Sequence, residues 1–304
     1  MVSGGGAPPA GPDPAAAGEA VLAEAVRAYS AALGPRLRAA YALGSLAHGG
    51  FSPLVSDVDL GLILADPVAA GDDPALQEVA DAVRPRSELH ARLSVFWATP
   101  ATLRGAPGGR FPPLDRLDLL RNGRLLAGRD ERAGLPRPDG AELVRAGAEF
   151  ALDLLGPGWS GAGRPGLGSL RPGASTLPAD LADPAGLLAR GPRQLTKTVL
   201  FPVRFLHTAR TGEVGTNEAA ARSYAAGPAH PSVRLVQAAL RWRSAAPEPA
   251  EAEALLRREL LPLYLFFVAD HAGRLAGLGR PDLAAAYRSW HAQLLGIGDP
   301  GPNP

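Results

Sequence analysis

The stretch from Leu43 to Leu64 constrains this chain most, because it places two aspartates one residue apart inside an apolar run. Side chains of a β-strand alternate between its two faces, so Asp57 and Asp59 are expected side by side on one face. Two carboxylates at this separation repel each other unless a cation binds both, and Mg²⁺ prefers such oxygen ligands. The pattern therefore predicts a magnesium site. Without metal, both carboxylates would be unpaired, and neutral substitutions should not lower stability.

A glycine-serine turn lies upstream of this pair. Gly44 permits a tight turn after the apolar run from Ala39 to Leu43, and Ser45 offers a hydroxyl and a backbone N–H where a helix could begin. That geometry suits a phosphate group. A glycine-serine turn is common in proteins, and an aspartate pair more often belongs to a solvated strand edge. Neither feature alone therefore indicates a function.

Together, Gly44-Ser45, the spacer and Asp57-x-Asp59 resemble the nucleotidyltransferase superfamily that includes DNA polymerase beta. The segment GGFSPLVSDVDL is similar to the corresponding segment of aminoglycoside adenylyltransferases of the streptomycin and spectinomycin type. The resemblance implies an α/β (α+β) nucleotidyltransferase domain with a small mixed sheet, followed by an all-α helical-bundle domain. It also implies Mg²⁺ as cofactor and ATP as co-substrate. Asp57 and Asp59 would be catalytic metal ligands, and Gly44 and Ser45 would bind the nucleotide.

The composition limits the kinds of partner and site that this protein can have. The 304 residues, with 46% apolar content and a net charge of +1, are typical of a globular protein with room for two domains. A nucleic-acid binder usually carries a basic excess, so no such partner is expected. The absence of cysteine excludes disulfides, thiolate metal sites and a cysteine nucleophile. With no signal-peptide pattern and no apolar run long enough to span a bilayer, we expect a cytoplasmic protein without a membrane partner.

Periodicity and composition divide the chain into four parts: a disordered tail over 1–14, the catalytic domain over 15–134, the helical domain over 135–295 and a tail over 296–304. In the first domain we expect helices on one side of the sheet, with elements over 15–33 (helix), 38–43 (strand), 56–64 (strand), 74–83 (helix), 89–97 (strand) and 114–130 (helix, turn and return element). In the second we expect helices over 141–155, 193–211, 231–243, 251–275 and 281–295, with a break or kink at Pro202. The irregular segment 156–192 is expected to be disordered or a substrate lid carrying Trp159.

One feature departs from the superfamily pattern. A third acidic residue usually lies on the strand beside the aspartate pair, as a metal ligand or as the base for the acceptor hydroxyl. The matching position here is Ser94, which cannot accept a proton at neutral pH. Glu88 is six residues earlier and, in an extended strand, about 20 Å away. Either another group acts as the base or the chemistry is slow.

Lys197 is the only lysine among 31 basic residues. A compact ammonium against a triphosphate is one function for which the planar guanidinium of arginine is a poor replacement. The alternative explanation is that a single lysine has remained by chance and has no function. The resemblance implies that Lys197, with Arg204 and the following TGEVGTNEAA, belongs to the helical domain and that this lysine reaches the nucleotide.

Glu213 and Glu218 follow this helix, at the edge of the expected cleft. Their carboxylates could receive a cationic acceptor, and we predict them as substrate-binding residues. Equally, Thr216 or Asn217 could cap the next helix, with Glu218 complementing its dipole.

The sequence thus predicts a Mg²⁺-dependent enzyme that moves AMP from ATP to a hydroxyl of a small molecule, with an aminoglycoside-type antibiotic as the favoured acceptor. Two alternatives stay open. One is a toxin-like nucleotidyltransferase acting on RNA or protein, and the other is a non-catalytic nucleotide-binding relative that lacks the third carboxylate.

Overall fold

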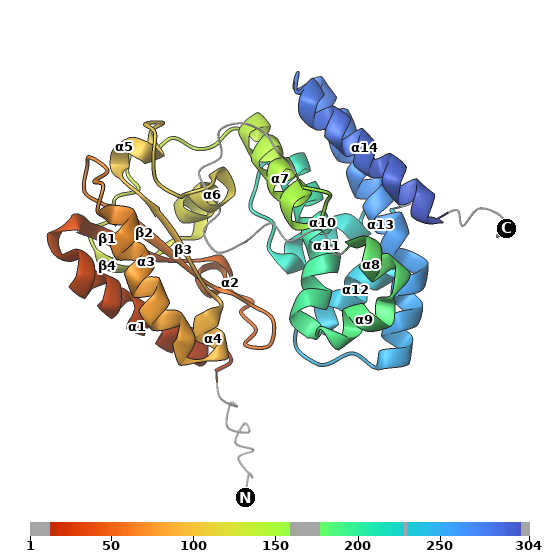
Figure 1. The fold of residues 1–304 in the computed structure, drawn as a ribbon, viewed down its shortest axis with the longest axis horizontal. Helices are drawn as coiled ribbons and strands as arrows, with labels where there is room; N and C mark the ends of the chain where they lie inside the picture. The colour runs from red at the N-terminus through yellow and green to blue at the C-terminus, as the bar shows by residue number, and fades with distance from the viewer. Residues whose placement is uncertain (1–12, 159–176, 228–229, 299–304) are drawn as a thin grey trace, which may run out of the picture.

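The computed structural model describes residues 13–158, 177–227 and 230–298. Figure 1 shows a small sheet with its helices in the N-terminal half and an all-helical C-terminal half beside it. The buried apolar side chains of the two halves form separate clusters, one within residues 144–294 and two within residues 21–119. We propose that these are two domains, divided between residues 129 and 139.

The sheet has four strands in the order β3-β2-β1-β4. Strand β1 is antiparallel to β2 and β4, whereas β2 and β3 are parallel, so the predicted small mixed sheet is confirmed. The strands are β1 Leu37–Leu43, β2 Val58–Leu64, β3 Leu93–Ala98 and β4 Arg124–Gly128.

Helices cover both faces of the sheet (Figure 1), so the expectation of helices on one side is wrong. The reason is visible in β2, where residues of both parities are apolar and buried. Leu60 and Leu62 pack toward α1 and α3, and Ile63 packs toward α5 and α6. The helices of this domain are α1 Ala16–Leu33, α2 Gly44–His48, α3 Asp72–Val83, α4 Glu88–Ala91, α5 Pro100–Leu103 and α6 Pro113–Asn122.

Strand β3 begins later than predicted, because a short helix precedes it. The Ser87 hydroxyl accepts a hydrogen bond from the backbone N–H of His90 and caps α4. Residues 88–91 are therefore helical, and Glu88 is not a strand residue. Its side chain is 95% exposed, so it does not supply the missing carboxylate.

The helical domain contains α7 Gly140–Leu154, α8 Leu177–Ala182, α9 Pro184–Ala189, α10 Pro192–Thr211, α11 Asn217–Ala225, α12 Val233–Arg241, α13 Pro249–Gly277 and α14 Pro281–Gly298. Two short helices thus occupy part of the segment expected to be irregular. Residues 159–176 of the suggested lid, Trp159 included, lie outside the described residues, as do residues 1–12 and 299–304 of the two tails. The tail expected from residue 296 begins later, because α14 continues to Gly298. No helix in the described ranges is long and apolar enough to cross a membrane.

The expected break at Pro202 is absent, and α10 continues through it. Proline lacks the N–H that would pair with the carbonyl of Thr198, four residues earlier. That carbonyl instead accepts a hydrogen bond of 2.8 Å from the buried hydroxyl of Tyr264 on α13. A side chain from another helix therefore satisfies the freed backbone group, which sequence periodicity could not reveal.

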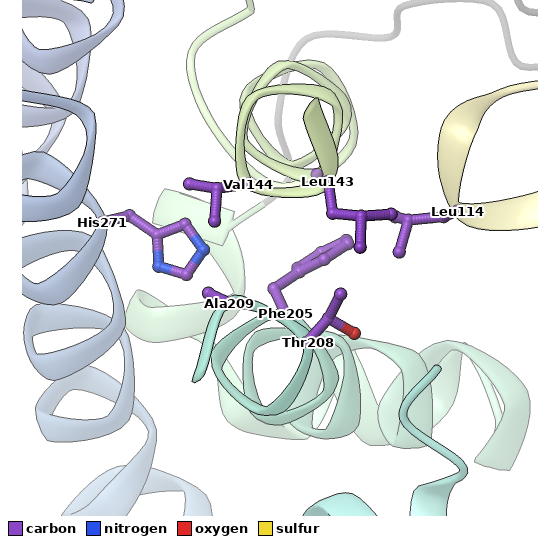
Figure 2. A pocket seen from close by; sticks show the side chains of 8 residues that line it. Leu114, Leu143, Val144, Phe205, Thr208, Ala209 and His271 are labelled. Atoms are coloured by element: carbon purple, nitrogen blue, oxygen red, sulfur yellow. The ribbon is translucent and has the colours of Figure 1, made fainter. Parts of the chain in front are cut away.

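Figure 2 shows a hollow where α6, α7, α10 and α13 meet. Leu114, Phe205 and His271 point into it, but the lining side chains leave no room for a water molecule. Burial lowers the pKa of His271 to about 4, so the imidazole is neutral at neutral pH. We read this region as packing between elements rather than as a ligand site.

Candidate active site

The site is built around Gly44, where β1 ends and α2 begins. Gly44 has a φ of +58°, and a Cβ at this position would collide with the carboxylate of Asp59. Both facts require glycine. The Gly44 N–H donates to Oδ2 of Asp118 at 2.6 Å, and the Asn122 side chain donates to Oδ1 of Asp118 at 2.7 Å. Asp118 is buried on α6 and thereby holds the turn in place.

Asp59 lies within β2, between Leu43 of β1 and Ser94 of β3. Register neighbours in a sheet project to the same face, so Ser94 occupies the position beside Asp59 that the sequence predicted. Burial and the negative charge of Asp57 raise the pKa of Asp59 to about 7. The positive charges of Lys197 and Arg204 oppose this shift.

Asp57 lies just before β2 and contacts the helical domain. Arg193 Nη2 is 2.5 Å from Oδ1 of Asp57, and Lys197 Nζ is 2.6 Å from Oδ2. Burial alone would raise the pKa of Asp57, but Lys197 and Arg193 hold it below its usual range. The expectation that both carboxylates are unpaired without metal is therefore wrong for Asp57.

Lys197 comes from the second turn of α10, and its ammonium pairs with Asp57 of the aspartate pair. The contact with a nucleotide that its isolation among arginines suggested stays a prediction. Burial lowers the pKa of its ammonium, although Asp57 opposes the shift. Its Nζ also lies 5.7 Å from the centroid of the Phe201 ring. Arg193, one helical turn earlier, was not predicted, and only its spacing of four residues from Lys197 could have indicated it.

Two carboxylates that the sequence did not identify come from α6. Asp115 and Asp118 are three residues apart and so lie on one face of the helix. Burial and the charges of Asp59 and Asp118 raise the pKa of Asp115 well above its usual range. The partly buried guanidinium of Arg204 opposes this shift, and its Nε donates to the carbonyl of Gly215 at 2.8 Å. Strand β3 thus carries no carboxylate beside Asp59, but helix α6 brings Asp115 close to it.

Glu213 and Glu218 each pair with arginine. Glu213 accepts hydrogen bonds from Arg121 and Arg137, both at 2.8 Å, and Glu218 pairs with Arg243. The Thr216 hydroxyl accepts from the N–H of Ala219 and caps α11, as the structural alternative anticipated. A cationic acceptor would have to compete with these arginines. Their contacts join the two halves of the molecule, since Arg243 also donates to the carbonyl of Gly50 at 2.5 Å.

The residues present fit a magnesium ion bound together with a nucleotide. Among the described residues, no group of three or more histidine, cysteine or acidic side chains is arranged to hold a metal ion by itself. Mg²⁺, however, is commonly bound by one or two carboxylates, with substrate phosphates and waters completing the shell. Asp57 already pairs with two cationic side chains, and Asp59 adds a second carboxylate directly beneath the Gly44 turn, so the site offers the oxygen ligands that such an ion takes.

The chain combines a mixed four-stranded sheet, an aspartate pair beneath a glycine-serine turn and a following helical bundle. The crystal structure of spectinomycin adenyltransferase AAD(9) from Enterococcus faecialis with ATP and spectinomycin matches 82% of this chain and 97% of that chain, with a TM-score of 0.54 and 13% sequence identity. No protein-family model and no curated protein sequence matches the chain. The likeness confirms the fold class, and the chemistry must be argued from the residues.

The two aspartates are expected to affect stability in opposite directions. Asp57→Asn leaves Arg193 and Lys197 without their anion and should lower the free energy of unfolding at pH 8 by about 1 to 3 kcal/mol. Because the folded-state pKa of Asp59 is raised, wild type loses stability as pH rises from about 4 to 7. Asp59→Asn should remove that loss and raise stability at pH 8 by about 1 to 3 kcal/mol, and the gain should shrink toward pH 4.

Urea unfolding of wild type and both variants at several pH values checks this prediction. Glu253→Gln, in an ion pair on the surface of α13, is the control. Equal stability changes for the two aspartate variants would contradict the charge arrangement described above.

Proposed function

We propose that this protein is a Mg²⁺-dependent nucleotidyltransferase that binds ATP between its two domains and transfers AMP to a hydroxyl of a small molecule. The observation that carries the proposal is the meeting of Asp57 and Asp59 with Lys197. A carboxylate pair from the sheet and a cation from the helical domain converge below the Gly44-Ser45 turn. Phosphoryl chemistry needs such positioning and charge neutralisation more than covalent participation by the protein.

In this proposal, Asp57 and Asp59 would hold the metal, and a bound metal would supply charge neutralisation for the phosphates. Gly44 and Ser45 shape the turn that approaches the phosphates, and Lys197 neutralises their charge from α10. The acceptor oxygen forms a bond to the α-phosphorus while the bond between that phosphorus and the bridging oxygen to the β-phosphate breaks. Pyrophosphate leaves with the bonding electrons.

We assign the proton acceptor to Asp115. The group must lie near the aspartate pair, and Ser94 on β3 cannot serve. Asp118 is engaged by the Gly44 N–H and the Asn122 side chain, which makes it a positioning residue. Asp115 lies on the same face of α6, and the charge of Asp59 acts on it, so this carboxylate is close to the aspartate pair.

The acceptor class is proposed from fold likeness. The matching structure is titled as a spectinomycin adenyltransferase with ATP and spectinomycin. We therefore place aminoglycoside-type antibiotics first among acceptors. Incubation with labelled ATP, Mg²⁺ and a panel of these compounds, read by mass spectrometry, should yield an AMP adduct of at least one of them. Asp59→Asn is the matched inactive control, and no adduct from any acceptor despite bound ATP would contradict the transferase proposal.

One observation favours a second candidate, a nucleotide-binding relative without catalytic activity. Asp57 is held by two cations, and β3 carries serine where the superfamily has an acidic residue. Such a protein would bind ATP with Mg²⁺ and release neither AMP adduct nor pyrophosphate. The same incubation, with pyrophosphate measured alongside the adduct, separates the two candidates.

A further inference from the structure

Arg193 makes a contact across the domain boundary that the roles assigned so far do not use. It lies in the first turn of α10, four residues before Lys197, and positions four apart in a helix share a face. Its Nη2 and Nε lie 2.5 and 3.2 Å from Oδ1 of Asp57. Lys197 takes the other oxygen, Oδ2, at 2.6 Å. Each oxygen of one carboxylate is thus occupied by a different cation.

At Asp57 itself, two positive charges meet one negative charge. One carboxylate faces two cations, and all three side chains remain partly accessible, with exposures of 22% for Asp57, 24% for Lys197 and 37% for Arg193. A metal ion on Asp57 would compete with these two cations for the carboxylate oxygens and would repel both of them. Both cations would then need another anion, since an unpaired, partly buried charge is costly.

We propose that Arg193 is a second polyphosphate-binding residue, and that Arg193 and Lys197 move together from Asp57 to the phosphates when the nucleotide and its metal bind. The inference rests on the proposed function and extends it to a residue with no assigned role. A polyphosphate supplies several anionic oxygens, and the guanidinium fork of arginine matches them with two parallel donors. The exchange keeps the two cations paired before and after binding, and it frees both oxygens of Asp57.

The exchange has an unusual consequence for metal-free binding. Asp57 competes with polyphosphate for the two cations, so Asp57→Asn should strengthen the binding of inorganic tripolyphosphate in the presence of a metal chelator. The same substitution should weaken the gain in ATP affinity that Mg²⁺ provides. Loss of a structural contact alone would not strengthen binding of any anion.

Calorimetry with inorganic tripolyphosphate, ATP and AMP, each with and without Mg²⁺, tests the proposal on the full chain. Arg193→Ala should lower the affinity for tripolyphosphate and for ATP about 10- to 100-fold, as expected for a charge-assisted phosphate contact. The affinity for AMP should stay nearly unchanged. Arg193→Lys keeps the charge and should recover part of the loss. Arg257→Ala, from an exposed ion pair on α13, is the control and should bind like wild type. Circular dichroism verifies that each variant is folded.

The outcomes separate this inference from the proposed function. A wild type that binds neither ATP nor tripolyphosphate, with or without Mg²⁺, overturns the proposed function. Suppose that wild type binds ATP with Mg²⁺, but Arg193→Ala weakens the binding of ATP and AMP equally or weakens neither. This result overturns the role of Arg193 and leaves the proposed function standing. Asp57→Asn that fails to strengthen metal-free tripolyphosphate binding overturns the exchange.

Discussion

Replacing Asp115 by asparagine is expected to slow AMP transfer about 100- to 10,000-fold, the usual contribution of a general base, with little change in ATP affinity. Asparagine preserves the shape of the side chain and removes its capacity to accept a proton. The nucleotide-binding groups come from other elements, namely α2, β2 and α10, so binding should persist. Single-turnover transfer rates, with ATP affinity from calorimetry, measure the two effects separately.

Ser94 provides the matched test. It neighbours Asp59 in the parallel register of β2 and β3, so Ser94→Glu places a carboxylate beside the aspartate pair. In the Asp115→Asn background this substitution should restore part of the lost rate. Unchanged transfer by Asp115→Asn would contradict the assignment of the base. If Ser94→Glu alone accelerated the otherwise unmodified protein by two or more decades, the natural chain would lack a working base.

Loss of the metal ligands is the second large effect. Asp57→Asn and Asp59→Asn should each remove the Mg²⁺-dependent part of ATP affinity and lower transfer by at least about 100-fold, since partners one shell further from a metal already contribute about 10- to 100-fold. Calorimetric titration with ATP, with and without Mg²⁺, measures the metal-dependent part. Glu253→Gln on α13 should behave as wild type. The metal site would be disproved by equal ATP affinity with and without Mg²⁺ in all of these proteins.

The fold class could be predicted because its signals are local. Apolar periodicity located most helices, and the run around Asp57 and Asp59 located the central strand. The position of Ser94 beside the aspartate pair was expected from the resemblance to the superfamily, and the register confirms that it neighbours Asp59. Where prediction failed, a contact from elsewhere in the chain or a short cap decided the structure. Tyr264 supports α10 at Pro202, and Ser87 converts the expected start of β3 into a helical turn.

Much of the candidate site could not be predicted for the same reason. Arg193 and Asp57 are 136 residues apart, and Gly44 and Asp118 are 74 apart. No spacing rule connects such positions, and aspartates in an amphipathic helix such as α6 usually face water. Glu213 was predicted to bind a substrate from its place near the expected cleft, and two arginines already pair with it, so that role stays a prediction.

The sole lysine gives the chain an unusual chemical property. Apart from the α-amino group, Lys197 is the only primary amine, and its partly buried ammonium has a lowered pKa, which favours the reactive neutral form. Amine acylation or reductive alkylation of this protein therefore modifies a single side chain, and that side chain lies at the contact between sheet and bundle. The extent of labelling at one peptide then reports directly on whether Lys197 is held by Asp57, held by another anion or open to solvent.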